Sequence, residues 1–471
     1  MDPSPAPVPN APITTDPEAT ARWRALDAAH YLHPFTDTKA LAAEGGSRII
    51  VAAEGVRLWD SEGHALLDGM AGLWNVALGY GRAELAEAAA AQMRRLSYYN
   101  SFFKTATPPS VELAARLAEL APAGLEHVFF TNSGSEANDT IIRMARHYWT
   151  LKGQPQRQTI ISREYAYHGS TLAAASACGP GQMPGGQGGL PLPGFSHILP
   201  PYHFDFGGDL DPESFGRQAA QALEARIQEL GPETVAAFIA EPIQGAGGVI
   251  IPPPGYWAEV QRICRAYDVL LIADEVICGF GRTGAWFASE RFDIAPDFMT
   301  VAKGITSGYL PLGAALVGER VARTLIDAGG EFFHGFTYSG HPVPCAVALE
   351  TLRLMAAERV VETVAEDTGP YLAERLATLR DHPLVGEVRS FGLLGAVELC
   401  ADKQARTRVQ PPGRAGQICR DHCLARGAVL RAVRDAIVMA PPLVITRAEI
   451  DALLEVLRAA LDATARDLGV A

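Results

Sequence analysis

Two apolar runs of this chain lead into charged residues, and those residues stand about thirty positions apart. Asp274 ends the run VLLIAD, and Lys303 follows the run FMTVA. Short apolar runs of this kind are typical of buried strands in a parallel sheet. Ligands of open α/β sheets bind beyond the carboxyl ends of the strands. The pattern therefore predicts an α/β fold in which Asp274 and Lys303 face one site.

This pair of residue types suits the chemistry of pyridoxal phosphate. A partly desolvated lysine amine can form the Schiff base that anchors this cofactor. A fixed carboxylate can keep the pyridine nitrogen protonated, so that the ring withdraws electrons from a carbanion. Lys303 and Asp274 are therefore the candidate catalytic residues.

From about residue 110 the chain alternates helical periods with short apolar runs. This alternation predicts a mostly parallel central sheet covered by helices. The helix expected in SVELAARLAEL would place Leu113, Leu117 and Leu120 on one face behind a Ser110 cap. The expected strands are HVFF, TIIS, VAAFIA, VLLIAD, FMTVA and AALVG.

The length of the chain predicts two domains. Its 471 residues exceed the size of about 250 to 300 residues at which single hydrophobic cores stop growing. We expect a large cofactor-binding domain and a smaller α+β domain built from both ends of the chain. The last helix would begin at a capping box of Thr446 and Glu449. The predicted parts are a flexible arm (1–30), the small domain (31–75 and 341–471) and the large domain (76–340).

Two segments rich in proline or glycine are expected to lie outside the packed core. The prolines near the N-terminus favour an extended, poorly ordered arm, and this arm lacks the basic and apolar regions of a secretory signal. Residues 179–194, GPGQMPGGQGGLPLPG, are expected to form a long surface loop. Such a loop either borders a site or merely connects two elements.

Composition argues against several kinds of partner. A net charge of -13 disfavours nucleic acid, and no apolar run approaches the roughly 18 residues of a membrane span. The seven cysteines do not form a disulfide framework, so the expected location is cytoplasmic. Cys419, His422 and Cys423 have helical spacing, but no second pair completes a metal site. A buried helix face is the favoured interpretation, and no metal is expected.

The motif TNSGSEAND lies between an expected strand and an expected helix. The first turn of a helix offers free backbone N–H groups and the positive end of the helix dipole, so a phosphate can bind there without a basic side chain. Gly134 and Ser135 are the candidate phosphate contacts. Alternatively, Ser135 merely caps the helix.

Tyr167 and His168 follow the apolar run TIIS in the motif YHGST. An aromatic ring at a strand end can lie flat on a pyridine ring, although core packing would also explain it. Gly169 would let the backbone approach a ligand closely.

The stretch GFGRTG matches the dinucleotide-binding fingerprint through Gly279, Gly281 and Gly284. That fingerprint needs a helix that begins at the glycines and a neutral strand end. Asp274 and Glu275 would repel a pyrophosphate here, and the following residues do not continue as a long helix. A flexible turn is therefore expected instead of a nicotinamide site.

Taken together, the motifs resemble the class III aminotransferases of the type I pyridoxal phosphate fold. The resemblance runs in order from about Tyr31 to the C-terminus, and it is carried by TNSGSEAND, EYAYHGST, AEPIQGAGG, ADEVICGFGRTG, AKGITSGYLPLG and HGFTYSGHP. Within that class, RWRALDAAHYLHPFTD, YYNSFFKT and RAVRDAIVMAPPLVIT are most similar to the ω-amino acid, polyamine or amine:pyruvate branch.

The resemblance implies a homodimer whose sites are shared between subunits. Thr337 would reach the phosphate of the neighbouring subunit's cofactor, and Phe102 and Phe103 would line the partner's pocket. Trp74 would form an aromatic wall on its own side, and Val276 would pack on the ring face opposite Tyr167. The alternative is that these aromatic residues only fill an interface.

Two more residues receive supporting roles from the resemblance. Glu241 would be a carboxylate beside the cofactor and not a catalytic acid, and His168 would be positional and not a base. Lys303 would move a proton from the substrate α-carbon to the cofactor C4' in a ping-pong reaction.

Arg431 matches the mobile arginine that the family uses for a substrate carboxylate. It would fork onto the acceptor's carboxylate and swing away when an apolar or cationic amine enters; a solvated surface arginine is the alternative. The γ-aminobutyrate and ornithine branch carries a Glu at the position of Ala246, so pyruvate is the favoured acceptor here. Arg434 replaces the Gly of close relatives, and it could repel Arg431, recruit Asp435 or a carboxylate, or point into solvent.

The expected activity is therefore amine:pyruvate transamination, which gives an aldehyde or ketone and L-alanine. The alternatives are a class III aminotransferase that uses 2-oxoglutarate, and an aminomutase or racemase of the same fold. A binding or regulatory protein is disfavoured because Lys303, Asp274 and Tyr167 are all present. The physiological donor, the stereoselectivity, the choice of dimer or tetramer and the role of the N-terminal arm stay open.

Overall fold

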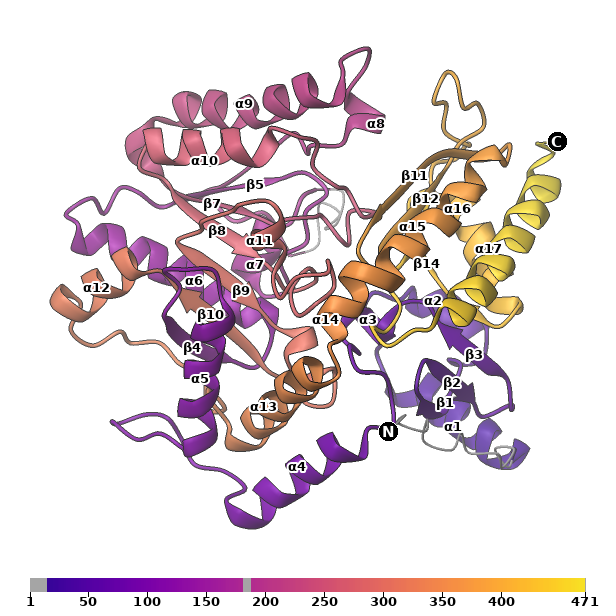
Figure 1. Cartoon of the computed structure of the whole chain (residues 1–471), viewed down its shortest axis with the longest axis horizontal. Coiled ribbons are helices and arrows are strands. Elements are labelled where there is room, and N and C mark those ends of the chain that lie inside the picture. Colours follow the sequence, from indigo (N-terminus) through magenta and orange to yellow (C-terminus); the bar gives the residue numbers. More distant parts are fainter. Residues whose placement is uncertain (1–14, 181–187, 471) are drawn as a thin grey trace.

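The computed structural model describes residues 15–180 and 188–470. At its centre lies a seven-stranded sheet in the order β4-β10-β9-β8-β7-β5-β6 (Figure 1). β10 runs antiparallel to β4 and β9, whereas the pairs from β9 to β6 are parallel. The strands are β4 (His127–Thr131), β5 (Thr159–Arg163), β6 (Phe195–Ile198), β7 (Val235–Ala240), β8 (Leu270–Asp274), β9 (Phe298–Val301) and β10 (Gly313–Val317). The predicted mostly parallel sheet is confirmed, with β6 as an additional edge strand.

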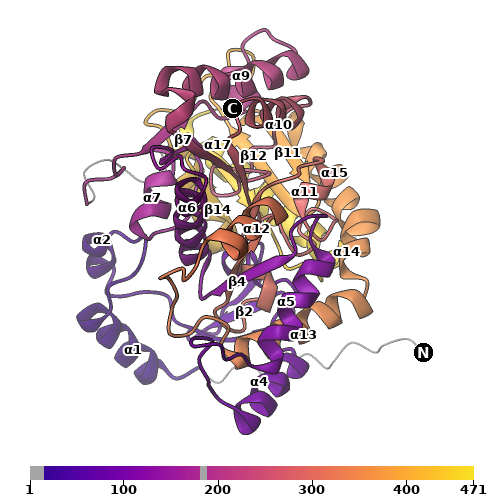
Figure 2. The same cartoon turned by 90° about the vertical axis from the view of Figure 1, so that its left-hand side faces the viewer.

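Helices cover both faces of this sheet, because successive residues of a strand point to opposite sides. Ile160 and Ile272 belong to the core beneath α6 and α12. Ile161 and Leu271 face the other way, into the core beneath α9 and α10. Figure 2 shows these two helices together at the top of the molecule. We call this sheet and its covering helices the large domain. The covering helices are α6 (Gly134–Leu151), α9 (Pro212–Leu230), α10 (Tyr256–Ala266) and α12 (Glu319–Ala328).

Two further sheets and their helices form what we call the small domain, which combines residues from both ends of the chain. One has the order β11-β12-β15-β14 and is antiparallel. The other has the order β1-β2-β3-β13, in which β13 pairs in parallel with β3 and so ties the N-terminal segment to the C-terminal one. Their strands are β1 (Ile50–Glu54), β2 (Arg57–Asp60), β3 (Ala65–Asp68), β11 (Val385–Phe391), β12 (Leu394–Leu399), β13 (Ala428–Val429), β14 (Arg431–Val433) and β15 (Ala436–Met439).

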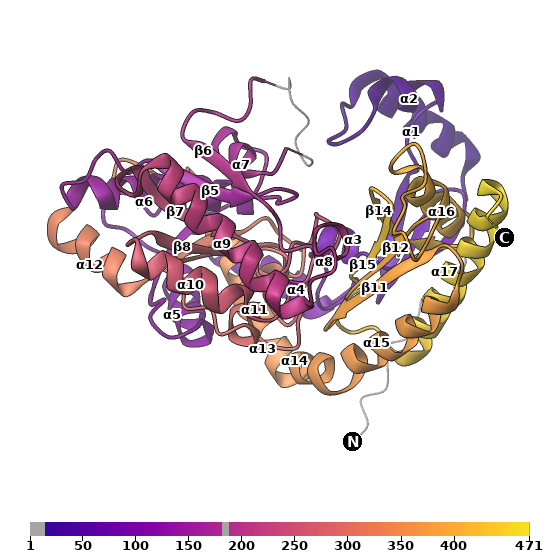
Figure 3. The same cartoon turned by 90° about the horizontal axis from the view of Figure 1, so that it is seen from above.

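The N-terminal helices α1 and α2 lie on the same side of the molecule as the C-terminal helices (Figure 3). α1 begins after an Asp16 cap, with a proline at its start. Residues 17–30 are therefore helical, so the expectation of an extended arm is wrong for them, and residues 1–14 lie outside the described residues. The helices outside the large sheet's cover include α1 (Pro17–His30), α2 (Thr38–Ala43), α3 (Ala71–Trp74), α4 (Ala83–Arg95), α5 (Pro108–Leu120), α13 (Pro342–Ala357), α14 (Val360–Thr363), α15 (Gly369–Ala377), α16 (Arg414–Ala425) and α17 (Arg447–Leu468).

Helix caps show how far local sequence predicts helix ends. The capping box of α17 is confirmed, because the Thr446 hydroxyl accepts from the backbone of Glu449 and the Glu449 carboxylate accepts from Thr446. The Ser110 cap is wrong: α5 begins earlier, with Thr107 as its N-cap and Ser110 in its first turn. Pro108 explains the earlier start, because its fixed φ suits the first helical position.

Several other expectations concern the periphery of the fold. Cys419 and Cys423 are buried on α16, and His422 bonds to Asp467. Residues 181–187 of the predicted surface loop lie outside the described residues. Within the described part of the chain, no helix is both long and apolar enough to cross a membrane. The predicted domain boundaries stay a prediction.

Candidate active site

Asp274 and Lys303 meet at the carboxyl edge of the central sheet. Asp274 is the last residue of β8, and Lys303 follows the end of the parallel neighbour β9. Both line a cavity of about 370 Å³. Lys303 has a φ of +47°, a left-handed conformation that a side chain rarely adopts without a reason in its surroundings. The cavity wall is completed by backbone and side chains of Leu73, Asn75, Asn132, Ser133, Gly134, Ser135, Tyr167, His168, Gly169, Glu241, Val276, Ile277, Ala302, Thr306, Gly308, Leu310, Pro311 and Leu312.

Burial lowers the pKa of Lys303, and the negative charges of Asp274 and Glu241 oppose this shift. Arg431 lies near enough to lower the pKa of Lys303 further. A lysine with a lowered pKa carries more of the neutral amine near pH 7, and only the neutral amine can act as nucleophile or base.

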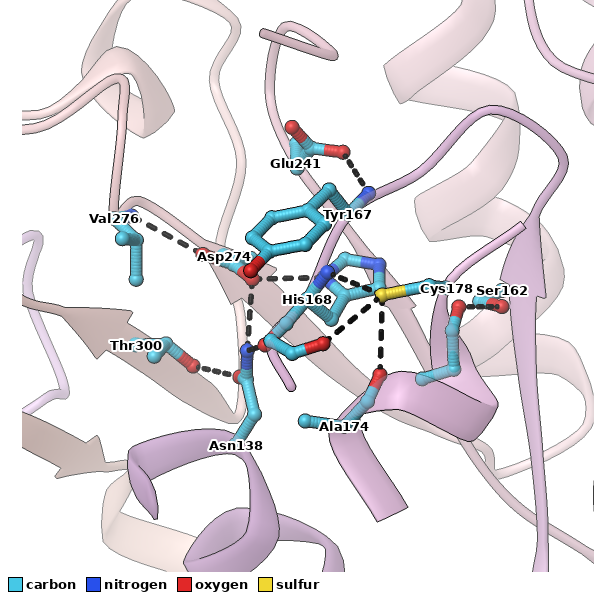
Figure 4. Close-up of polar contacts among 12 residues, drawn as sticks. Asn138, Ser162, Tyr167, His168, Ala174, Cys178, Glu241, Asp274, Val276 and Thr300 are labelled. Carbon is cyan, nitrogen blue, oxygen red and sulfur yellow. Dashed lines mark hydrogen bonds and ion pairs between the residues drawn. The ribbon is translucent and has the colours of Figure 1, made fainter. Parts of the chain in front are cut away.

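Asp274 is held by three hydrogen bonds (Figure 4). His168 Nδ1 donates to Oδ2 at 2.7 Å, and Asn138 Nδ2 donates to the same oxygen at 2.9 Å. The Val276 N–H donates to Oδ1 at 3.1 Å. These bonds fix the carboxylate in one orientation toward the cavity.

Asn138 is a site residue that the sequence analysis missed. It lies buried on α6, where its amide nitrogen also donates to the His168 carbonyl at 2.6 Å. Thr300 Oγ1 donates to Asn138 Oδ1 at 2.6 Å and so sets the orientation of the amide. An available signal was the spacing within SEAND, since Asn138 stands one helical turn after Gly134 and therefore on the same face.

His168 is also held on its backbone side. Its N–H donates to Cys178 Sγ at 3.0 Å. Burial raises the pKa of Cys178 to about 12, so this thiol stays neutral near pH 7. The network of Asp274, His168, Asn138 and Cys178 is therefore a support for the carboxylate.

The start of α6 forms one end of the cavity. Ser133, and not Ser135, caps this helix by accepting from the Glu136 N–H at 3.2 Å. Ser135 Oγ instead accepts from the Ser170 N–H at 3.0 Å. The first turn of a helix leaves its N–H groups without intrahelical partners, so those of Gly134 and Ser135 can bind a phosphate.

Glycine is needed twice in this region. A Cβ at Gly134 would lie 2.9 Å from Val276 Cγ2, and a Cβ at Gly169 would lie 2.6 Å from Ser135 Oγ. Gly169 also has a φ of +139°. These close approaches bring the YHGST segment and Val276 against the start of α6.

Tyr167 and Glu241 lie together on another wall of the cavity. Glu241 Oε1 accepts from the Tyr167 N–H at 3.1 Å, and Oε2 accepts from the Gly245 N–H at 3.0 Å. Burial raises the pKa of Glu241. Tyr167 and Val276 both line the cavity, and the ring of Tyr167 stands above Asp274 in Figure 4.

Other predicted site residues stand outside the wall of this cavity. Trp74 is buried, and the Arg431 guanidinium lies 5.0 Å from its ring centre, while Leu73 and Asn75 form the wall at this point. Phe103 is 90% exposed, and Phe102 and Thr337 also lie at the surface of this chain. The structure therefore does not bring these last three residues into the chain's own cavity.

Arg434 neither pairs with Asp435 nor points freely into solvent, while its repulsion of Arg431 and its recruitment of a substrate carboxylate stay predictions. Its Nη2 donates to the Gly247 carbonyl at 2.8 Å, and its guanidinium lies 4.1 Å from the ring centre of Tyr165. Asp435 is occupied elsewhere, since it accepts from the N–H groups of Gly413 and Gly416 at the start of α16. Arg434 is thus half-buried and is directed toward the large domain.

The GFGRTG stretch forms a turn. Gly281 and Gly284 have φ values of +86° and +77°, which glycine adopts at little cost. The next helix is the short α11 (Ala288–Arg291), which begins after this stretch has ended. The glycines therefore do not open a dinucleotide-binding helix.

The residues present fit pyridoxal phosphate. Gly134 and Ser135 line the cavity at the first turn of α6, where backbone N–H groups can bind a phosphate. Asp274, held by two side-chain donors, can face a pyridine nitrogen. Lys303, Tyr167 and Val276 line the same cavity, so a Schiff base and ring contacts are available.

Comparison with known proteins identifies the family. Residues 41–461 match the family model of class III aminotransferases. The chain is 54% identical to a putrescine–pyruvate aminotransferase of Pseudomonas aeruginosa, over 95% of this chain and 97% of that protein. It is 40% identical to a diaminobutyrate–2-oxoglutarate transaminase of Halomonas elongata, over 90% of this chain and 92% of that protein.

The solved structures that resemble this chain are also aminotransferases. An (S)-enantioselective ω-transaminase from Thermomicrobium roseum has a TM-score of 0.91 and 49% identity, with 96% of this chain and 100% of that chain covered. The ω-transaminase of Pseudomonas jessenii in complex with PMP has a TM-score of 0.91 and 43% identity, with 94% and 98% covered. The chain therefore belongs to the class III aminotransferase family, and it is a pyridoxal phosphate-dependent aminotransferase of the type I fold.

Proposed function

We propose that this aminotransferase moves the amino group of a primary amine to pyruvate. The amine leaves as an aldehyde or ketone, and pyruvate becomes L-alanine in a second half-reaction. The similarity to a putrescine–pyruvate aminotransferase over nearly the whole chain supports an amine donor and a pyruvate acceptor. Polyamines, ω-amino acids and aryl or alkyl amines are the donor classes to be tested.

The observation that carries this proposal is the environment of Arg431. Burial lowers the pKa of Arg431, and the nearby Tyr167 opposes the shift. Among the described residues, no carboxylate forms an ion pair with Arg431. A half-buried guanidinium near Lys303 and without an acidic partner is suited to an incoming carboxylate, which it can bind through two parallel hydrogen bonds.

The identity of residue 246 favours pyruvate over 2-oxoglutarate. The methyl group of Ala246 cannot neutralise Arg431 as a glutamate side chain could. Without a glutamate that switches Arg431 off, a donor of the glutamate-forming kind fits less well, and this favours pyruvate as the acceptor. Trp74 supports this role by offering a flat ring on which the guanidinium rests.

The other site residues receive these roles in the proposal. Pyridoxal phosphate supplies the ring that withdraws electrons from the carbon to which the amine is attached. Lys303 Nζ anchors the cofactor and takes the proton from that carbon. Asp274 keeps a positive charge on the pyridine nitrogen, Tyr167 restrains the tilt of the ring, and Gly134 and Ser135 hold the phosphate.

A panel of amines tests the proposal. Diamines, ω-amino acids and arylalkylamines are each supplied with pyruvate or with 2-oxoglutarate, and the products are identified. L-alanine should form with at least one amine. Faster turnover with 2-oxoglutarate for every amine would favour the alternative acceptor. Rearrangement of labelled substrate without nitrogen in alanine would indicate an aminomutase or racemase.

Replacing Arg431 by methionine is expected to raise the KM for pyruvate about 10- to 100-fold. This range corresponds to the loss of a charge-assisted hydrogen-bonded pair worth roughly 1.5–3 kcal/mol. The KM for an amine without a carboxylate should change little. Steady-state kinetics with each substrate varied in turn would measure both values, and Arg323→Met, at an exposed position on α12, is the control. Equal effects on both substrates would contradict the role of Arg431.

We also propose that the enzyme is a homodimer whose subunits complete each other's sites. Phe102, Phe103, Phe333 and Tyr338 are exposed apolar side chains on segments near Thr337. Exposed apolar groups gathered in this way mark interaction surfaces. Thr337 would then reach the phosphate of the partner's cofactor, and the two phenylalanines would line the partner's pocket.

Replacing Phe103 by serine is expected to weaken the dimer and to lower activity at low protein concentration. Loss of a buried phenylalanine costs about 1.5–3 kcal/mol. A symmetric dimer loses two of them, so the dimer dissociation constant should rise roughly 10²- to 10⁴-fold. Sedimentation equilibrium would measure it. Leu210→Ser, at another exposed apolar residue, is the control. An unchanged dimer dissociation constant would contradict this interface.

A further inference from the structure

Two arginines of the small domain hold one turn of the large domain. Arg434 Nη2 donates to the Gly247 carbonyl at 2.8 Å. Arg389 Nη2 donates to the Gly248 carbonyl at 2.7 Å, and its Nε donates to the Val249 carbonyl at 3.1 Å. Three consecutive carbonyls of this turn are therefore bound by guanidinium groups that lie on β11 and at the tip of the β14–β15 hairpin.

The same turn supports the segment that carries Tyr167. Glu241, just before the turn, accepts from the N–H groups of Tyr167 and Gly245. Gln244 Nε2 donates to the Glu164 carbonyl at 2.9 Å. These hydrogen bonds connect the turn to the segment that carries Tyr167, so a shift of the turn would also move Tyr167.

Arg434 also contacts the Tyr167 segment directly. Its guanidinium lies 4.1 Å from the ring centre of Tyr165, two residues before Tyr167. This is a close stacking distance for a planar guanidinium on an aromatic ring. Arg434 has a φ of +53°, which an arginine adopts at a cost. The backbone conformation aims this side chain across the boundary between the domains.

Arg431 is the first residue of the short strand β14, and Arg434 follows the last residue of this strand. β14 pairs with β15 from Arg431 opposite Val438 to Val433 opposite Ala436, so Arg434 lies in the tip of a tight hairpin. Asp435 fixes the other side of the tip to the start of α16. What holds the tip therefore also holds the backbone from which Arg431 extends.

We propose that Arg434 is a positioning residue for the keto-acid half-reaction, because it sets the place of Arg431 relative to Tyr167. The hydrogen bond to Gly247 holds the β14–β15 hairpin against the turn at residues 247–249. The stack on Tyr165 holds the hairpin against the segment that carries Tyr167. Arg434 itself does not touch the acceptor, since its guanidinium is engaged by the carbonyl and the ring. This inference rests on the proposed function only in that the acceptor carries a carboxylate.

The test compares three variants with the wild-type holoenzyme. Arg434→Gly keeps the left-handed backbone conformation, which glycine adopts readily, and removes both contacts. Arg434→Lys restores a donor but not a planar stacking group. Arg406→Gly is the matched control: Arg406 has a φ of +53°, lies 5.5 Å from the Phe204 ring centre and donates to the Phe204 carbonyl, far from Arg431 in the chain.

Arg434→Gly should raise the KM for pyruvate about tenfold, a change that corresponds to one charged hydrogen bond. The KM for a carboxylate-free amine should stay within about twofold, and Arg434→Lys should recover part of the loss. Thermal unfolding of the cofactor-free variants shows whether the fold is intact. Arg406→Gly should lower the unfolding temperature by about as much as Arg434→Gly does, but it should not selectively raise the KM for pyruvate.

Three results would overturn the inference: equal changes in both KM values, no change in either, or the same selective change in Arg406→Gly. If the wild-type enzyme forms no alanine from pyruvate, the proposed function has failed, and the same comparison is made with the keto acid that it does use. A selective rise in that KM would still support Arg434 as a positioning residue. No selective rise would reject it.

Discussion

The Lys303→Ala variant is expected to fold and to dimerise but to lose turnover by at least about 10³-fold. Removal of this side chain deletes both the group that anchors the cofactor and the base that takes the proton, and a positioned base alone contributes about 10²- to 10⁴-fold. Single-turnover absorbance with an amine would measure the loss. Lys152→Ala, at an exposed lysine at the end of α6, is the control and should keep full activity.

A second measurement separates loss of chemistry from loss of folding. Burial lowers the folded-state pKa of Lys303 below its usual 10.5. The charged amine therefore costs stability below that folded pKa, and the cost disappears as pH rises toward the unfolded pKa. Cofactor-free Lys303→Met should be more stable than cofactor-free wild type near pH 7, and the difference should narrow at alkaline pH. Normal turnover in either Lys303 variant would mean that the chemistry is assigned to the wrong residue.

Asp274→Asn is expected to lower kcat/KM by about 10³-fold while the protein still binds pyridoxal phosphate. A neutral amide cannot stabilise a positive pyridine nitrogen, and an opposite charge at this range shifts a pKa by about 1–3 units, each unit a factor of ten. In the wild type, Asp274 Oδ2 accepts hydrogen bonds from both His168 and Asn138. If the NH₂ group of the introduced asparagine takes the place of this oxygen, it cannot accept either bond. Activity and cofactor affinity are measured together.

The expected signature of Asp274→Asn is a large loss of rate with a smaller loss of cofactor affinity, because the phosphate contacts at α6 are untouched. Asp209→Asn, at an exposed aspartate, is the control for a lost negative charge. Wild-type kcat/KM in Asp274→Asn would contradict the role of Asp274. A protein that no longer binds the cofactor at all would show that Asp274 acts mainly in binding.

The sequence allowed the core of the site to be predicted because its signals are local. Asp274 and Lys303 each follow an apolar run that must be buried, and parallel strands bring their carboxyl ends to one edge. The turn before α6 and the capping box of Thr446 follow from a few adjacent residues. Such patterns depend on helix and strand periodicity and not on the rest of the chain.

The supports of the site were not predictable in this way. Asn138 is a buried polar residue in a helix, and its partners Asp274 and Thr300 are more than a hundred positions away in the chain. The cap of α6 is Ser133 and not Ser135, because the backbone conformation at the helix start places the Ser133 hydroxyl against the Glu136 N–H.

The sequence by itself determined the sheet, the family and the meeting of Asp274 with Lys303 at one edge, since periodic burial and a few spaced motifs carry that information. Only the tertiary structure decided where the Arg434 side chain lies. Its neighbours in the sequence allowed a pairing with Asp435 or exposure to solvent, whereas the side chain lies against Gly247 and Tyr165. The physical reason is that a long, flexible cation finds its partners by proximity in space, and the packing of the small domain on the large domain sets that proximity.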